Sequence, residues 1–164
     1  MRISSVVERE SHNLEVNGAI PLSATTLRMK MAEIFVFGSN LLGIHKRGAA
    51  LHALNHHGAI LGQGIGLQGS SYAIPTKQSP SRRLDLVQIN KFVADFLDYA
   101  YYTPENTYMV TQIGCGLAGW NPCQIAPLFR LARDLGNVKL PMPFQDYLPW
   151  MEIMPNSIAL FDGF

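Results

Sequence analysis

The order of apolar and polar residues predicts strands and helices in alternation from residue 34 onward. Residues 34–37 form a short continuous apolar run, which is typical of a buried strand. Residues 84–101 carry apolar side chains at helical spacing, and this stripe is expected to face the core; its members are Ile89, Phe92, Val93, Phe96, Leu97 and Ala100. The full pattern predicts strands at 34–37, 72–76, 107–113 and 137–140, and helices at 47–57, at 84–101 and from Pro122 to before Gly136.

This alternation predicts an α/β fold with a mixed, largely parallel sheet and helices on both faces. In the helix at 47–57, the residues expected to point inward are Ala50, Leu51 and Leu54. Parallel sheets bind ligands outside the carboxyl ends of their strands. The loops after the first and third strands are therefore the places where we expect function.

Residues 1–30 lack this pattern, because charged and polar residues are mixed there without a helical or strand period. Two interpretations stay open: an extension or start-site artefact, with translation beginning at Met29 or Met31, or a short edge strand near 13–16. The regular core is expected to span 31–141. A tail at 142–164, with Pro143, Pro149 and Pro155, is expected to pack on the core without regular structure.

Composition narrows the function classes. The net charge is +1, from 13 basic and 12 acidic residues, which gives no electrostatic argument for binding a nucleic-acid backbone. The two cysteines, Cys115 and Cys123, are too few for a disulfide framework or a metal site. No apolar stretch is long enough to span a bilayer and no secretory signal is evident, so we expect a cytoplasmic protein without a membrane partner. We expect neither cofactor nor metal.

The strongest motif is the run Gly114-Cys115-Gly116-Leu117-Ala118-Gly119-Trp120, which follows a strand and leads into a capped helix. Glycines allow backbone N–H groups to approach phosphate oxygens, and a helix start is electropositive. The alternative is a tight turn whose glycines serve geometry alone. The run also satisfies G-x-G-x-x-G, but it comes too late in the chain for a dinucleotide fold.

Two other segments are weaker candidates. Residues 64–69 match the same pattern but precede a strand, which favours a flexible hairpin or lid; Gln68 is a candidate ligand contact there. At the end of the first strand, Asn40 is a candidate for hydrogen bonding a ribose hydroxyl or for an Asx-turn. Gly48, Ala49 and Ala50 begin a helix with small residues, which suits either close approach of a ligand or helix packing.

The histidines, Cys115 and Trp120 are weaker candidates for a functional role. His45, His52, His56 and His57 cluster near the first helix, and they are expected to be surface or partly packed side chains instead of a metal site. Cys115 would lie near a helix start, which favours a thiolate, but no base partner can be named. Trp120 is expected either to close over the site or to cap the core.

In this order, the motifs FGSN, RGAA, YAIPTK and IGCGLAG resemble the macro-domain superfamily, over about residues 34–140. The likeness is greatest to the terminal ADP-ribose glycohydrolase subclass and to small bacterial and phage macro-domain-like proteins. It implies a three-layer α/β/α sandwich with an ADP-ribose cleft between two phosphate loops, one at Gly48–Ala50 and one at Gly114–Gly119, with Asn40 near the distal ribose.

The resemblance also bears on catalysis. Lys77 matches the lysine that attacks the distal ribose in the glycohydrolases, but the acid/base Asp of that subclass is replaced by Ala118. General acid–base help is worth roughly 10²–10⁴-fold in rate. We therefore expect binding of ADP-ribose or a related nucleotide, free or attached to protein or nucleic acid. The alternative is an ADP-ribosyl or nucleotide-derivative hydrolase that uses Lys77 or Cys115.

Overall fold

The computed structural model describes residues 31–148. The chain divides into two units, Met1–Lys30 and Met31–Phe164, and the described residues all belong to the second. The strand considered at 13–16 and most of the expected tail, from residue 149 onward, lie outside the described residues.

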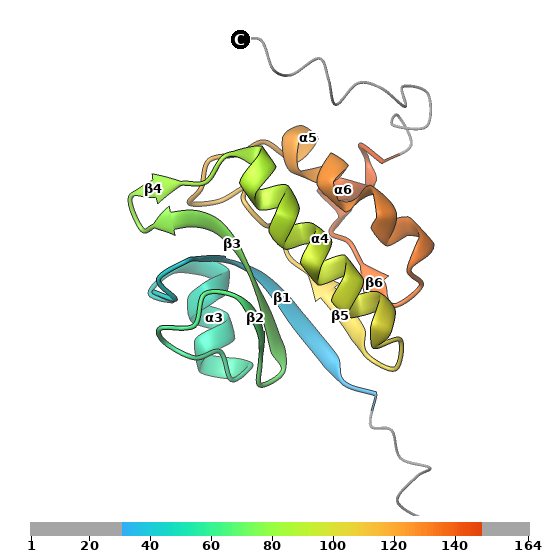
Figure 1. Cartoon of the computed structure of the whole chain (residues 1–164), viewed down its shortest axis with the longest axis horizontal. Helices are drawn as coiled ribbons and strands as arrows, with labels where there is room; N and C mark the ends of the chain where they lie inside the picture. Colours follow the sequence, from blue (N-terminus) through green and yellow to red (C-terminus); the bar gives the residue numbers. More distant parts are fainter. Residues whose placement is uncertain (1–30, 149–164) are drawn as a thin grey trace, which may run out of the picture. The chain divides into compact units, whose positions relative to one another are not determined.

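Six strands form one sheet in the order β2-β3-β1-β5-β6, with β4 paired to β3. The strands are β1 (Glu33–Asn40), β2 (Gly66–Gln68), β3 (Ser71–Ser79), β4 (Arg82–Arg83), β5 (Thr107–Val110) and β6 (Val138–Lys139). The helices are α3 (Gly48–His56), α4 (Leu86–Tyr102), α5 (Pro122–Ile125), the 3₁₀ segment η1 (Ala126–Asp134) and α6 (Met142–Gln145). Strand β1 runs parallel to β3 and β5, and β6 runs parallel to β5. The prediction of an α/β fold with a mixed, mostly parallel sheet is therefore confirmed (Figure 1).

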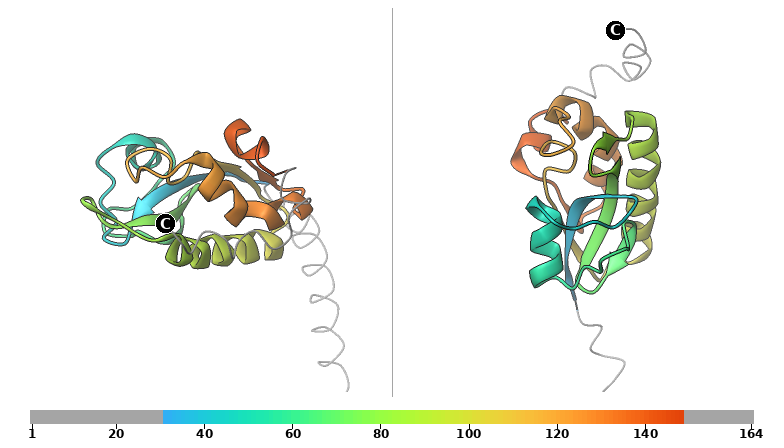
Figure 2. Two further views of the ribbon diagram at one scale, coloured as in Figure 1. Left: turned by 90° about the horizontal axis from the view of Figure 1, so that it is seen from above. Right: turned by 90° about the vertical axis from the view of Figure 1, so that its left-hand side faces the viewer.

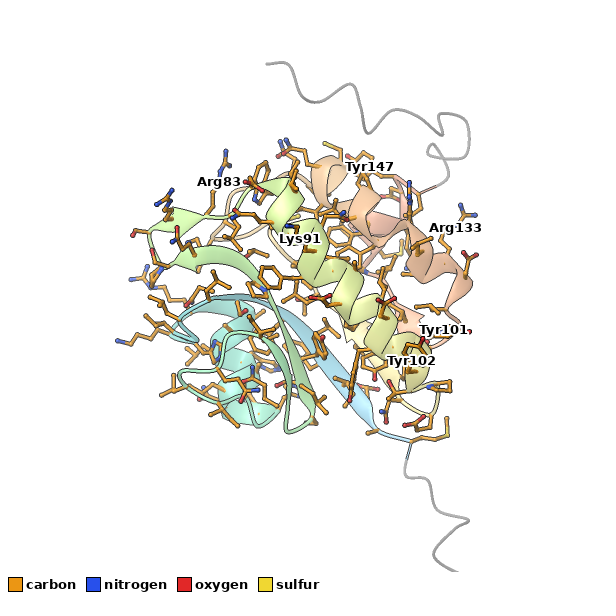
Figure 3. All side chains as sticks on the ribbon, in the orientation of Figure 1. Arg83, Lys91, Tyr101, Tyr102, Arg133 and Tyr147 are labelled. Atoms are coloured by element: carbon orange, nitrogen blue, oxygen red, sulfur yellow. The ribbon has the colours of Figure 1, made fainter. Side chains whose placement is uncertain are left out.

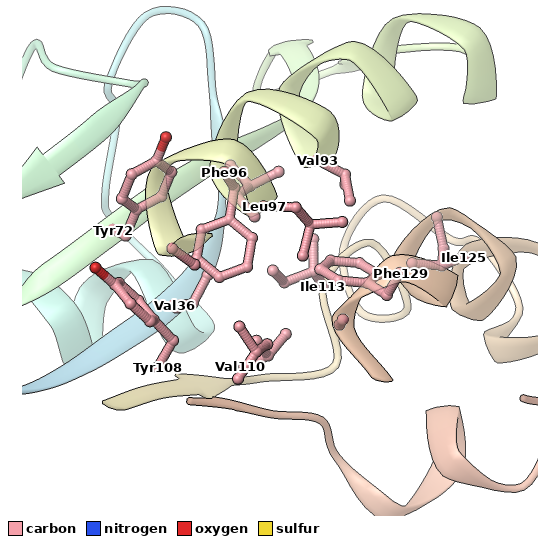
Figure 4. Close-up of a cluster of buried hydrophobic side chains, with 14 of the residues drawn as sticks. Val36, Tyr72, Val93, Phe96, Leu97, Tyr108, Val110, Ile113, Ile125 and Phe129 are labelled. Atoms are coloured by element: carbon pink, nitrogen blue, oxygen red, sulfur yellow. The ribbon is translucent and has the colours of Figure 1, made fainter. Parts of the chain in front are cut away.

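The two faces of the sheet are buried by different helices. Side chains alternate along a strand, so Ile34 and Val36 of β1 join the cluster beneath α4 and η1, while Phe37 joins the cluster beneath α3. Figure 2 shows α3 and α4 on opposite sides of the sheet. Figure 4 shows the larger cluster, in which Phe96 packs between the strands and Phe129.

The predicted stripe of α4 holds. Five of its six residues are buried, namely Ile89, Val93, Phe96, Leu97 and Ala100, and Phe92 packs partly buried against the same cluster. Asp85 accepts a hydrogen bond from the Gln88 N–H at 2.7 Å, and Gln88 Oε1 accepts one from the Asp85 N–H at 3.2 Å. This capping box satisfies backbone donors at the helix start. In α3, by contrast, Leu51 is exposed, and the small Ala50 and Ala53 face the sheet.

The predicted helix after Asn121 is correct at its start and wrong in its form. Asn121 is the N-cap of α5, as expected, but α5 has four residues and continues as the 3₁₀ segment η1. Pro127 explains the change, because it has no N–H to donate within an α-helix and its ring clashes with the preceding turn. The segment still packs on the core, since Ile125, Phe129 and Ala132 are buried.

The sheet and the tail also differ from expectation. Strand β3 extends from Ser71 to Ser79 through Pro75. On its outer side, pairing with β2 stops at Ala73 and pairing with β4 begins at Lys77. Pro75 therefore lies where no outer strand is paired, so its missing N–H is tolerated. Residues Met142–Gln145 form one helical turn within the stretch expected to be irregular, with Pro141 at the N-cap.

Within residues 31–148, no helix is both long and apolar enough to cross a membrane.

Two loop backbones meet closely next to the end of β1, which gives a first test of the fold. A Cβ at Gly64 would collide with the Asn40 carbonyl, and backbone atoms cannot rotate out of the way. We expect Gly64→Ala to destabilise the fold by about 2 kcal/mol or more, which lowers Tm by roughly 8 °C. The measurement is thermal unfolding followed by circular dichroism.

The matched control is Gly136→Ala, because an added Cβ there meets no atom within 4 Å. Its Tm should stay at the wild-type value or rise slightly. Equal Tm values for the two variants would contradict the close approach at Gly64.

Candidate functional site

The carboxyl ends of β1, β3 and β5 lie at one edge of the sheet, and three loops start there. The roots of these loops touch. A Cβ built on Gly38 would lie 3.6 Å from the Gly114 nitrogen and 3.6 Å from the Thr76 hydroxyl. Thr76 Oγ1 also donates to the Ser39 carbonyl at 3.3 Å. The candidate site is therefore built on strands held in direct contact, and Figures 1 and 2 show the loops emerging together.

Asn40 braces the loop that follows β1. Its Nδ2 donates to the Ile44 carbonyl at 2.9 Å, and its Oδ1 accepts from the Ile44 N–H at 3.1 Å. The side chain is buried. The structure thus assigns the Asn40 amide to an Asx-type turn, which was one of the two interpretations, and not to a free surface facing a ribose.

Gln68 likewise holds the segment between α3 and β2 through hydrogen bonds to its backbone. Its Oε1 accepts from the Ile60 N–H at 2.7 Å, and its Nε2 donates to the Gln63 carbonyl at 2.9 Å. Gln68 is buried in the hairpin of β2 and β3. Its amide is therefore used to shape the 58–68 segment, and neither polar atom is left pointing at a ligand.

His45 connects the loop after β1 to the segment between α3 and β2 from a buried position. It is fully buried, which differs from the expected partly packed histidine, and its ring packs edge-on against Phe37 at 5.3 Å. Its Nε2 lies 3.0 Å from the Gln63 carbonyl, which can only accept, so Nε2 carries the hydrogen. Its Nδ1 is buried and has no partner among residues 31–148.

The first turn of α3 is open to an anion. Arg47 is the N-cap, makes no side-chain cap hydrogen bond, and no acidic residue lies in the first turn. In the part of the chain that the structure describes, the N–H groups of Gly48, Ala49 and Ala50 donate to no acceptor. Unsatisfied N–H groups and the helix dipole together favour a negatively charged ligand.

The glycine loop after β5 presents a second set of free donors. Gly114 adopts φ +78°, which allows the chain to turn back so that Trp120 N–H reaches the Gly114 carbonyl at 3.0 Å. The Gly119 N–H donates to the Gly116 carbonyl at 2.9 Å. Over the described residues, the N–H groups of Gly116, Leu117 and Ala118 have no acceptor. Three consecutive free donors in a tight loop are suited to an oxyanion.

Helix α5, which follows the glycine loop, offers a phosphate fewer N–H donors than the sequence predicts. Helix α5 is only one turn long, and the N–H of its N-cap Asn121 donates to Gln124 Oε1 at 3.1 Å. The donors available to a phosphate are therefore those of the loop itself.

The two candidate nucleophiles lie in different surroundings. Lys77 Nζ donates to the Pro80 carbonyl at 2.7 Å, within the β3–β4 hairpin. Burial raises the pKa of the Cys115 thiol, and the Cys123 thiol adds to this shift. Desolvation thus acts against the thiolate that the expected helix-start effect would favour.

Trp120 lies at the end of the glycine loop and anchors it to the core. It packs, half-buried, against the larger core cluster, and its ring is covered by the Arg83 guanidinium at 4.2 Å. Its indole N–H is buried without an acceptor in residues 31–148. Trp120 therefore links the glycine loop to β4, an arrangement that the sequence did not predict because β4 has no apolar pattern.

The remaining histidines lie at the other end of α3. The rings of His52 and His56 are 4.7 Å apart, and His57 stacks on Phe35 at 4.5 Å. Desolvation lowers the pKa of His57, with the charges of His52 and His56 adding to the effect. The described residues contain no group of three or more His, Cys, Asp or Glu side chains placed to hold a metal ion.

No protein-family model matches the sequence, and no significant match is found among the curated proteins or the solved structures.

The raised pKa of Cys115 can be tested against Cys123, which is exposed. In single-cysteine variants (Cys123→Ser and Cys115→Ser), we expect Cys115 to react several-fold more slowly with iodoacetamide at neutral pH, because less of it is thiolate. Its reaction rate should keep rising at pH values where that of a small unperturbed thiol levels off. A Cys115 that reacts faster than Cys123 at neutral pH would contradict this account.

Proposed function

We propose that this chain binds ADP-ribose or a closely related nucleotide, free or attached to protein or nucleic acid, as a macro-domain-like module. The observation that carries the proposal is the pair of free-donor segments. Gly48–Ala50 and Gly116–Ala118 each offer three consecutive N–H groups without an acceptor in the described chain, after neighbouring parallel strands. A diphosphate needs several such donors, and a glycine-bearing loop and a helix start supply them.

The arrangement of the helices supports a macro-like three-layer sandwich. Helix α3 covers one face of the sheet, and α4 with η1 covers the other. The two donor segments follow β1 and β5, which are adjacent and parallel. Parallel sheets place ligands at this carboxyl edge. Of the four ordered motifs noted in the sequence, RGAA and IGCGLAG fall on the two donor segments, whereas FGSN and YAIPTK lie in β1 and β3.

The buried side chains have a supporting part in this proposal. Asn40, Gln68 and His45 hold the segments around α3 in one conformation through hydrogen bonds to backbone groups. A preordered loop loses little conformational entropy when a ligand binds, which improves affinity without any new contact.

The observations favour binding over hydrolysis. The position of the subclass acid is the buried Ala118, which cannot transfer a proton. The Lys77 ammonium is bound to the Pro80 carbonyl, and the Cys115 thiol has a raised pKa. An attack on C1″ of a ribose needs an activated nucleophile, and these two contacts favour that role for neither residue.

The proposal predicts that a negative charge at the start of α3 weakens ADP-ribose binding. Full-length protein should bind ADP-ribose in the micromolar range by isothermal calorimetry. Ala49→Asp places a carboxylate in the first turn of α3. The helix dipole stabilises this carboxylate, but its negative charge repels the phosphates of the ligand. We expect the affinity to fall by about tenfold or more, equivalent to about 1.4 kcal/mol.

The matched control is Val87→Asp, because Val87 holds the same second position in α4 and is exposed. Its affinity should equal that of the wild type, with both variants retaining the wild-type circular dichroism spectrum. Equal losses in the two variants would assign the effect to net charge, and absence of wild-type binding to ADP-ribose, ADP and NAD would overturn the proposed function.

A further inference from the structure

The β3–β4 hairpin concentrates positive charge that the described protein does not neutralise. Strand β4 consists of Arg82 and Arg83, and Lys77 lies opposite Arg83 in the ladder. Among residues 31–148, no carboxylate forms an ion pair with any of the three. The nearest acid in sequence, Asp85, uses its Oδ1 to accept from the Gln88 N–H at 2.7 Å.

A directly opposed pair of like charges is unfavourable in an antiparallel ladder. Here the two charges are separated by neutral partners. Lys77 Nζ turns to the Pro80 carbonyl, and the Arg83 guanidinium lies 4.2 Å from the centroid of the Trp120 ring. These contacts reduce the repulsion but add no negative charge. An anion placed between the two cations would remove it.

The Arg83 guanidinium is prepared for such an anion. Stacking on an aromatic face fixes the plane of the guanidinium while its N–H edges stay free for oxyanions. Figure 3 shows Arg83 projecting at the β4 end of the molecule, far from Arg133. The hairpin also carries the hydroxyls of Ser79 and Ser81, which lie 3.3 Å apart at its turn. The hairpin therefore contains two kinds of donor, hydroxyl and guanidinium, that bind phosphate oxygens.

We propose that the β3–β4 hairpin is a second phosphate site, whose ligands are side chains and not the backbone N–H groups of the two donor segments. Arg83, held on Trp120, is the main ligand, and Arg82 with Lys77 supplies the remaining positive charge. The ligand class is a phosphate dianion, which is either the monoester group of a sugar phosphate or free inorganic phosphate. This site does not rest on the proposed function, since it uses none of the free N–H groups of α3 or the glycine loop.

The test is a titration of the ¹⁵N-labelled full chain, followed by NMR at constant ionic strength. The probes are ribose 5-phosphate and inorganic phosphate, and the reporters are the Arg83 Nε–H and Trp120 Nε1–H signals, assigned with Arg83→Gln and Trp120→Phe. We expect saturable shifts of both signals. Tighter binding of ribose 5-phosphate identifies a sugar phosphate as the ligand, and tighter binding of inorganic phosphate identifies the free ion.

Variants separate this site from general charge and from the α3 site. Arg83→Gln should weaken phosphate binding by about tenfold, whereas Arg130→Gln, which removes an exposed arginine on η1, should leave it unchanged. Arg83→Lys keeps the charge without the planar fork and should bind with intermediate affinity. Ala49→Asp should leave the hairpin titration unchanged.

Shifts that never saturate, or equal losses in Arg83→Gln and Arg130→Gln, would overturn the hairpin site. Saturable hairpin binding without any binding of ADP-ribose would uphold this inference while rejecting the proposed function. If ADP-ribose binds but neither phosphate probe shifts the hairpin signals, the hairpin site is rejected and the proposed function is upheld.

Discussion

Strand β1 is the element on which the rest of this structure depends. It pairs in parallel with β3 on one side and β5 on the other, and its side chains supply both hydrophobic clusters. A Cβ on Gly38 would be in van der Waals contact with the Gly114 backbone and the Thr76 side chain, so these strand ends lie side by side. Because β1 fixes the ends of its neighbours, the loops that follow all three strands are held at one edge of the sheet. The chemistry of the candidate site follows from that placement.

The site is built from backbone donors more than from reactive side chains. Its polar side chains, Asn40, His45 and Gln68, are directed at the loops' own backbone. Among residues 31–148, the N–H groups of Gly48–Ala50 and Gly116–Ala118 remain without an acceptor, and so does the buried Trp120 indole N–H. Backbone donors recognise the charge and shape of an oxyanion without altering it chemically. This architecture is the basis of the proposal that the chain binds a nucleotide without cleaving it.

Sequence patterns predicted the elements whose formation is local. The stripe of α4 and the apolar run of β1 are long or strongly patterned, and the N-cap Asn121 is a local signal. The pattern did not reveal β4, because two arginines carry no strand period, although the charge cluster from Lys77 to Arg83 was a usable signal. Pro127 was the available sign that α5 would tighten into η1. The partners of Asn40 and Gln68 depend on how distant loops meet, so only the three-dimensional structure assigns them.

The central claim is that the two free-donor segments bind one nucleotide together. The most direct measurement is a ¹H–¹⁵N correlation spectrum of the full chain during titration with ADP-ribose. The account predicts that the amide signals of Gly48–Ala50 and of Gly116–Ala118 shift in parallel with a single dissociation constant. Saturable binding that leaves either segment unshifted, or the absence of any shift, would contradict it.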